Sequence, residues 1–273
     1  MSRQISLKQY VSFFRLRFSM GLQYRTAAVA GMVTQFVWGA MEIMVYNAFY
    51  KADASAFPMT FEAVTSYIWF QQAFLALFAS WIYEDEIFTS ISNGNVAYEL
   101  CRPVRIYEMW FARGVALRLS RAVLRCMPIL LFAALLPEPY GLTLPNDKLS
   151  FVCFIPALIL SLFVVVAFSN LIYVLTFFMV SSQGLRVFSI SLMDFFTGAV
   201  IPIPFFPEGV RKIMEVLPFA AMQNVPLRIY SGDITNGQIP YAFGLQIFWL
   251  LVMVWAGKHL LQYALKKITL QAG

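Results

Sequence analysis

Six apolar runs separated by short polar segments dominate the hydropathy pattern of this 273-residue chain. They cover about residues 26–50, 63–83, 115–136, 151–180, 185–204 and 240–262. A helix needs roughly 20 apolar residues to cross the hydrocarbon core of a bilayer, and each run reaches that length. The pattern therefore predicts an all-α, polytopic membrane protein with six transmembrane helices, formed as one domain over residues 1–273.

Composition agrees with a lipid environment. The chain is 60% hydrophobic and only 12% charged, which leaves too few polar residues to cover a water-soluble globule. The net charge of +6 is not taken as a sign of nucleic-acid binding. In a membrane protein, the distribution of basic residues along the chain indicates its orientation in the bilayer. With a cytoplasmic N-terminus, 15 of the 20 Lys and Arg residues fall inside and 5 outside. This asymmetry predicts that both termini are cytoplasmic, and it suits a bacterial inner (cytoplasmic) membrane.

The segment before the first run has helical periodicity over about residues 5–24. An apolar stripe and an adjoining polar stripe recur at offsets of three and four, which is typical of an amphipathic helix lying in the membrane interface. The alternative is a solvated helix packed on a partner. The apolar stripe comprises Leu7, Val11, Phe14, Phe18 and Leu22, and the polar stripe comprises Lys8, Ser12, Arg15 and Ser19.

The polar stretch after the second run, residues 84–108, is cytoplasmic in this orientation. Its acidic opening suits a helix N-terminus, because the helix dipole favours negative charge there. Gly94 lies among turn-forming residues, and Pro103 ends any helix that runs through residues 98–101. A short helix, a turn and a second short helix are expected. The element could dock a cytoplasmic motor or be an ordinary ordered loop, and spacing alone does not separate the two.

Prolines divide the stretch from Gly198 to Asp233 into apolar pieces that are too short to span a bilayer and too hydrophobic for a free loop. Short re-entrant helices in the outer leaflet fit this pattern. Irregular backbone at membrane depth requires shielding by protein or a water-filled cavity, so these pieces are expected to cap a bundle or a pathway. The prolines are Pro202, Pro204, Pro207, Pro218 and Pro226.

Charges within the apolar runs are costly and usually have a partner. Arg118, Arg121 and Arg125 lie at i, i+3 and i+7 on one helix face. Snorkelling to inner-leaflet phosphates explains Arg118 and Arg121 more readily than Arg125. We hypothesise that Arg125 pairs with Asp194, or second with Glu42, beside the pathway. Each acid could instead be a protonated carboxyl or lie at a subunit contact, and a third alternative is direct binding of an anionic substrate.

Motifs for chemistry within the chain are missing. There is no Gly-x-x-x-x-Gly-Lys-Ser/Thr phosphate loop, and the single histidine, His259, has no Cys or carboxylate at metal-ligand spacing. The three cysteines suit packing rather than disulfides or metal binding. We therefore predict no catalytic, cofactor or metal site in this chain, and no enzymatic activity.

The chain as a whole resembles permease subunits of the ABC transporter type-2 family, in the branch of small six-span permeases. The resemblance rests on four features: the amphipathic N-terminal helix, ISNGNVAYELCRPV at residues 91–104, the proline-broken passage GAVIPIPFFP…LPF…VPLRIYSGD, and the basic end KKITLQAG. Together, in this order, they are fairly specific.

The resemblance implies a permease that pairs with a second permease, identical or related, and with two separate cytoplasmic ATPase subunits that supply ATP and magnesium. It implies export by alternating access, with membrane lipid as surroundings and no nucleic acid. A coupling helix that seats in the ATPase is expected among Glu84, Asp85, Glu86, Ile87, Phe88, Ser90, Ser92, Asn93, Gly94 and Asn95. Glu42, Arg121, Arg125 and Asp194 are the candidate buried-charge and pathway residues.

Two other functions compete with this one. An ion- or proton-coupled secondary transporter would use Glu42, Arg125 and Asp194 without an ATPase. A membrane enzyme acting on lipids is disfavoured, because the one tight acidic cluster, residues 84–86, has no basic or metal-ligand motif beside it in sequence.

Overall fold

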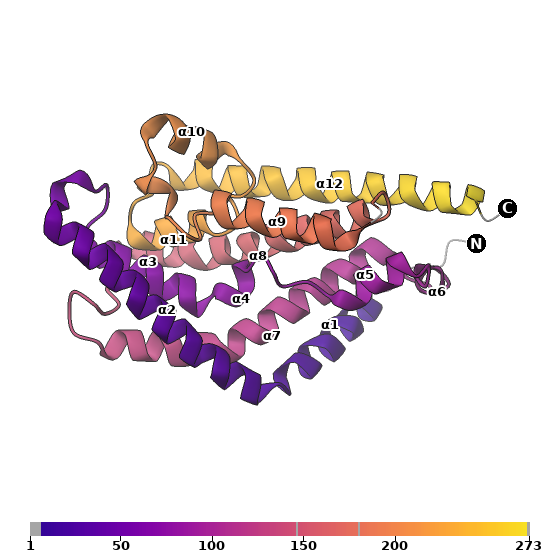
Figure 1. Cartoon of the computed structure of the whole chain (residues 1–273), viewed down its shortest axis with the longest axis horizontal. Coiled ribbons are helices and arrows are strands. Elements are labelled where there is room, and N and C mark those ends of the chain that lie inside the picture. Colours follow the sequence, from indigo (N-terminus) through magenta and orange to yellow (C-terminus); the bar gives the residue numbers. More distant parts are fainter. Residues whose placement is uncertain (1–6, 146, 180, 272–273) are drawn as a thin grey trace.

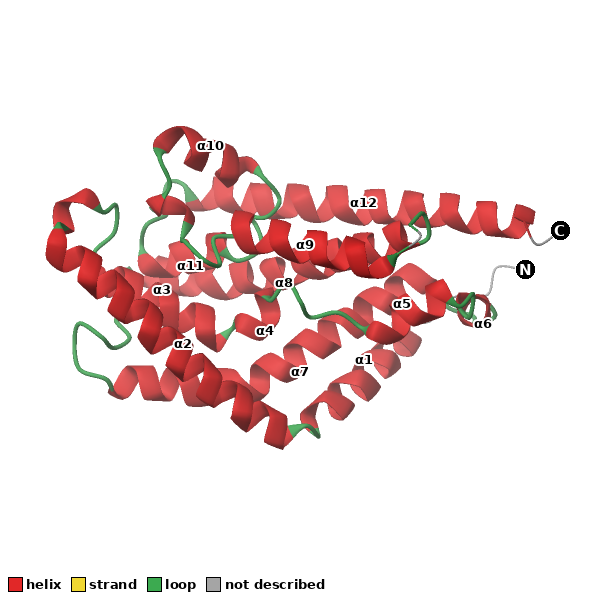
Figure 2. Cartoon of the chain, in the orientation of Figure 1, coloured by secondary structure: helices red, strands yellow, loops and turns green. Residues whose placement is uncertain are grey.

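The computed structural model describes residues 7–145, 147–179 and 181–271, and in these residues the regular structure is helical throughout (Figure 2). Figure 1 shows the C-terminal helix running along the long axis of the molecule, other long helices inclined to it, and both chain ends at the same end of that axis. The all-α fold class predicted from the apolar pattern is confirmed.

Four long helices correspond to predicted spans one, three, four and six. They are α2 (Arg25–Ala52), α7 (Ile106–Leu135), α8 (Lys148–Thr176) and α12 (Ile239–Gln271). By length and composition, α2, α8 and α12 are the helices of the described residues that qualify as membrane spans. Helix α7 is as long but carries four arginines, Arg113, Arg118, Arg121 and Arg125. It also begins nine residues before the predicted run.

Two predicted spans differ from single long helices. The run 63–83 forms α3 (Phe61–Ala73) and α4 (Leu75–Phe78), followed by a non-helical segment over residues 79–84. The run 185–204 forms α9 (Ser182–Phe196), whose 15 residues rise only about 22 Å. Gly198, at φ +78°, turns the chain after α9 and Pro202 keeps it from resuming a helix.

The N-terminal helix α1 (Leu7–Leu22) runs alongside the first half of α7 (Figure 1). Tyr10 and Phe13 pack against the main core, and Gly21 lies against Ser120 of α7. The packed face is therefore rotated from the predicted apolar stripe, since Leu7 is exposed. Helix formation is confirmed for residues 7–22, whereas residues 5 and 6 lie outside the described part.

The proline-rich passage folds into short elements, as predicted. After α9 come η2 (Ile203–Phe205), α10 (Glu208–Val216) and α11 (Asn224–Ser231), before α12 begins. Pro202 and Pro207 precede the first residues of η2 and α10, and Pro226 lies in the first turn of α11, where its missing N–H is tolerated. Helix α11 packs on α8 and α3. The position of these elements in a membrane stays a prediction.

Candidate functional site

A cavity of about 990 Å³ lies between α2, α3, α4, α9 and the chain that follows α9. Most of its lining is apolar, and the exposed side chains of Trp38, Phe49 and Trp81 border it, so it opens at the surface of the chain. An apolar cavity with a few polar groups is the usual form of a small-molecule site. Predicted pathway residues Glu42, Arg125 and Asp194 all line it.

Glutamines supply much of the polar lining. Gln35, Gln71, Gln72 and Gln223 are each at least 95% buried and reach the cavity from α2, α3 and the chain before α11. The side-chain amide of Gln71 donates to the carbonyl of Ala199 at 2.8 Å. Neither Nε2 nor Oε1 of Gln35 has a hydrogen-bond partner. Buried amides without partners are rare in proteins and point to a ligand-facing role.

Arg125 forms no ion pair with Asp194 or Glu42 in the described structure, contrary to the hypothesis drawn from their matched depth. Its guanidinium lies against α2, with Nη2 at 3.5 Å from the carbonyl oxygen of Ala27. Asp194 instead accepts a hydrogen bond from Ser80 at 2.6 Å. Glu42 lies 3.5 Å from Nε2 of Gln72, and its Oε1 is buried without a partner. The three charges share a cavity without neutralising one another directly.

Arg118 does not snorkel, which corrects the sequence-based interpretation. It is 98% buried and its guanidinium donates to the carbonyl oxygens of Leu77, Ala79 and Ile82 and to the hydroxyl of Ser169, at 2.7–3.2 Å. Leu77 lies at the end of α4, where the last carbonyls of a helix have no partner within it, and Ala79 and Ile82 lie in the non-helical segment that follows. Arg118 therefore holds the break after α4 in place.

A second cavity, of about 630 Å³, lies where α1 turns into α2. Arg17, Arg121, Arg125 and residues 84–86 contribute to its lining. Arg121 is exposed and does not reach the 990 Å³ cavity, whereas Arg125 borders both. Arg118, Arg121 and Arg125 thus occupy different environments, although their spacing places them on one helix face.

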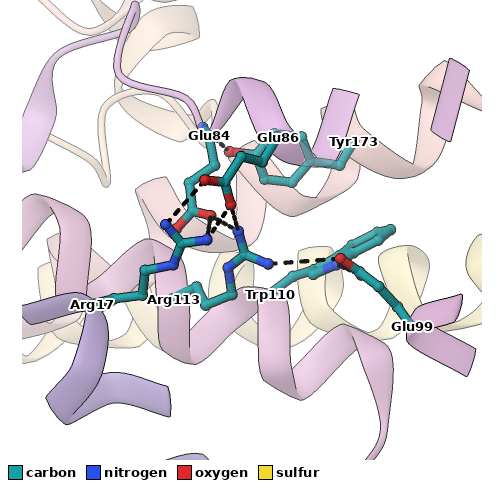
Figure 3. Close-up of polar contacts among 7 residues, drawn as sticks. All are labelled: Arg17, Glu84, Glu86, Glu99, Trp110, Arg113 and Tyr173. Carbon is teal, nitrogen blue, oxygen red and sulfur yellow. Dashed lines mark hydrogen bonds and ion pairs between the residues drawn. The ribbon is translucent and has the colours of Figure 1, made fainter. Parts of the chain in front are cut away.

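An acid–arginine cluster ties the candidate coupling segment to its neighbours (Figure 3). Arg113 of α7 is 95% buried and pairs with Glu84, with Glu86 at 2.9 Å and with Glu99 at 3.7 Å. Arg17 of α1 also pairs with Glu86. The hydrogen bond from Arg17 holds the pKa of Glu86 below its ordinary value of 4.5. Arg17 and Arg113 were not predicted from the sequence, because their partners lie far along the chain.

The candidate coupling residues form α5 (Asp85–Ser92), a turn at Gly94 and α6 (Val96–Leu100). This is the helix, turn and helix that was predicted, with Gly94 at φ +74°. Ile87 and Phe88 are buried, and Ser90 is half-buried. Asp85 pairs with Arg186 of α9 at 2.8 Å. Ser92, Asn93, Gly94 and Asn95 are exposed, as is Tyr98, which the sequence analysis did not single out.

Comparison with known proteins places the chain in a family. A family model described as ABC-2 family transporter protein matches residues 36–272. No curated protein and no solved structure matches the chain significantly. The matched range covers α3 to α12 and most of α2, including the coupling segment and most of the lining of the 990 Å³ cavity. This chain belongs to the ABC-2 family of membrane transport proteins, whose members are transport components that work with ATPase subunits.

Proposed function

We propose that this chain is the transmembrane permease subunit of an ATP-binding-cassette exporter and moves an amphipathic substrate outward across the inner membrane. It crosses the membrane six times with both termini inside, and the second and fifth crossings consist of α3–α4 and α9 together with the non-helical chain that follows each. It pairs with a second permease, which covers the exposed apolar border of the 990 Å³ cavity, and with two cytoplasmic ATPase subunits.

One observation carries this proposal: the cavity wall and the coupling segment are nearly contiguous. Ser80 and Trp81 line the cavity, and α5 begins at Asp85, so three residues separate them. A movement of α5 is therefore passed to the wall without passing through a helix. Ser80 also contacts Asp194, which extends the effect to α9.

The surface that docks the ATPase is, in this proposal, narrower than residues 84–95. Glu84, Ile87 and Phe88 face inward and hold the segment on the permease. The exposed turn, Ser92 to Asn95, together with Tyr98 of α6, is free to contact a partner.

The full chain, solubilised from its native membrane in mild detergent, tests the docking surface. We expect an ATPase to co-purify stoichiometrically, and Tyr98→Ala combined with Asn93→Ala to lose it. Tyr241→Ala is the matched control, since Tyr241 is comparably exposed and belongs to the first turn of α12, which begins at the end of the molecule opposite to α6 (Figure 1). Equal retention in both variants would contradict this surface.

A secondary transporter is the alternative, and it is favoured by one feature, the two acids Glu42 and Asp194 in the same cavity. Reconstituted vesicles separate the two functions. Transport that requires ATP and survives dissipation of the proton gradient supports the exporter. Transport that follows a proton gradient with no co-purifying ATPase supports the carrier.

A further inference from the structure

We infer that Arg121 and Arg125 bind the phosphate-bearing headgroup of an anionic amphiphile of the inner leaflet, at the 630 Å³ cavity beside the turn from α1 to α2. The inference rests on the orientation given in the proposed function. It does not require that the chain pair with an ATPase.

Arg121 and Arg125 differ from three nearby arginines in their charge pairing. Arg113 and Arg17 pair with Glu84 and Glu86, and Arg186 pairs with Asp85. Within the described residues, Arg121 and Arg125 have no such partner.

The spacing of Arg121 and Arg125 adds electrostatic repulsion to their lack of carboxylate partners. Arg121 and Arg125 are one helical turn apart, at i and i+4, so their charges repel each other. A phosphate group is anionic and has several acceptor oxygens. Placed between the two guanidinium groups, it relieves this repulsion and forms charge-assisted hydrogen bonds with both.

The turn from α1 to α2 indicates how deep Arg121 and Arg125 lie in the membrane. Gly21, at the end of α1, lies against Ser120, the residue before Arg121. Arg25 begins α2, and the exposed Tyr24 lies between the two helices. Basic and aromatic residues at the start of a span mark the inner membrane boundary, where lipid headgroups lie. Arg121 is therefore level with those headgroups, and Arg125 is about one turn deeper.

The 630 Å³ cavity also has apolar surface for the acyl chains of the ligand. The cavity is also lined by apolar side chains, namely Met20, Ala27, Ala28, Leu117 and Leu124. Arg125 borders the larger apolar cavity as well. A headgroup held at Arg121 and Arg125 would thus have apolar surface beside it for acyl chains. Free phosphate would leave that surface without use, so the amphiphile is the better fit.

Native mass spectrometry of the full chain, exchanged into detergent containing phosphatidylglycerol, tests the site. We expect bound phosphatidylglycerol at about one per chain, with apparent affinity reduced at least about tenfold in the double variant Arg121→Gln and Arg125→Gln. Arg121→Lys with Arg125→Lys should retain most of the binding, because the charges remain. Arg15→Gln is the control, an exposed arginine of α1 outside the cavity lining, and it should leave binding unchanged.

Three results would overturn the inference: equal affinity in wild type and the Gln double variant, equal losses in that variant and in Arg15→Gln, or equal binding of zwitterionic phosphatidylcholine. Competition by millimolar inorganic phosphate alone, without retention of lipid, would identify a free-anion site and contradict the amphiphile. Thermal unfolding of each variant separates loss of binding from loss of fold. Because ATP and the ATPase are left out, failure here is distinct from failure of the proposed function.

Discussion

Gly31 of α2 leaves the space in which the guanidinium of Arg125 lies. A Cβ placed on Gly31 would be 2.6 Å from Cζ of Arg125 and 2.7 Å from its Nη1. A Cβ atom does not make non-bonded contacts that short, so any side chain at position 31 excludes the guanidinium from its place against α2.

Gly31→Ala should therefore act on Arg125 more than on the fold. The displaced atoms are the far end of a flexible side chain, which can move at small cost, so the thermal unfolding midpoint should change little. Binding of phosphatidylglycerol should weaken in the direction of Arg125→Gln. Gly244→Ala on α12, where a Cβ meets open space, is the matched control and should leave binding intact. If Gly31→Ala binds lipid as wild type does, Arg125 is not positioned by this contact.

Arg118→Leu should be among the most destabilising single changes in α7. It leaves three carbonyl oxygens at and after the end of α4 unpaired in a buried site, at about 1–3 kcal/mol for each. Arg121→Leu removes the same charge from an exposed position and should cost far less. Thermal unfolding in detergent compares the two, and similar midpoints would contradict the role assigned to Arg118.

The Glu84–Arg113 pair should show the asymmetry of buried ion pairs. Arg113→Ala leaves the buried Glu84 with Arg17, at 3.8 Å, as its remaining partner, so the loss should approach that of a broken buried ion pair, about 3–5 kcal/mol. Replacing both residues with glutamine should recover part of that loss. Asp85→Asn is the control: it breaks the pair with Arg186, but the Asp85 carboxylate is 76% exposed, so about 0–1 kcal/mol is expected. Unfolding midpoints that fall equally in all three variants would refute this ranking.

Glu86 should make the docking of α1 sensitive to acid. Its pKa is lowered below 4.5 in the folded chain, so its contribution to stability is fully present above the unfolded value and is lost as pH falls through the folded value. The effect is small because the Glu86 side chain is 67% exposed. Wild type and Glu86→Gln should differ at pH 7 and converge as pH falls below about 4.5, measured by thermal unfolding. If the difference in unfolding midpoint between wild type and Glu86→Gln grows on acidification, Glu86 does not stabilise the fold through its carboxylate form.

Gln35→Leu should stabilise the chain and impair transport. Burial of the Gln35 amide without hydrogen bonds costs about 1–3 kcal/mol, which leucine avoids. Gln246→Leu is the opposite case, because the Gln246 amide donates to Ser161 at 2.9 Å and to the carbonyl oxygens of Ala157 and Ala221. Its removal should lower the unfolding midpoint. A stabilised Gln35→Leu chain with full transport activity would leave Gln35 without a functional role.

The apolar pattern predicted the long helices because their burial or lipid contact is a local property of the sequence. Helix α8 lies close to its predicted range for this reason, and α12 begins within one residue of its predicted start but continues nine residues beyond the predicted end. The end of α9 also had a local signal, since Gly198 and Pro202 follow it, but the run was apolar enough to mask that signal.

The break between α3 and α4 had no such signal. No proline or glycine occurs between Phe61 and Trp81, and the apolar run continues through the break. What stabilises the break is Arg118, some 40 residues further along the chain. Arg118 has nearly the same local sequence context as Arg121 and Arg125, so periodicity could not tell a buried arginine from an exposed one. The pairing of Glu84 with Arg113 was hidden in the same way.

The hydrogen bonds of Arg118 join residues 77–82 to α7, and Arg113, five residues earlier on α7, holds the start of α5. Since α5 and the segment after α4 are both held on α7, these three parts should move together. A force on the exposed turn near Gly94 would then rotate α7 as a body. The 990 Å³ cavity would change width where α7 slides past α2, at the close contact of Arg125 with Gly31.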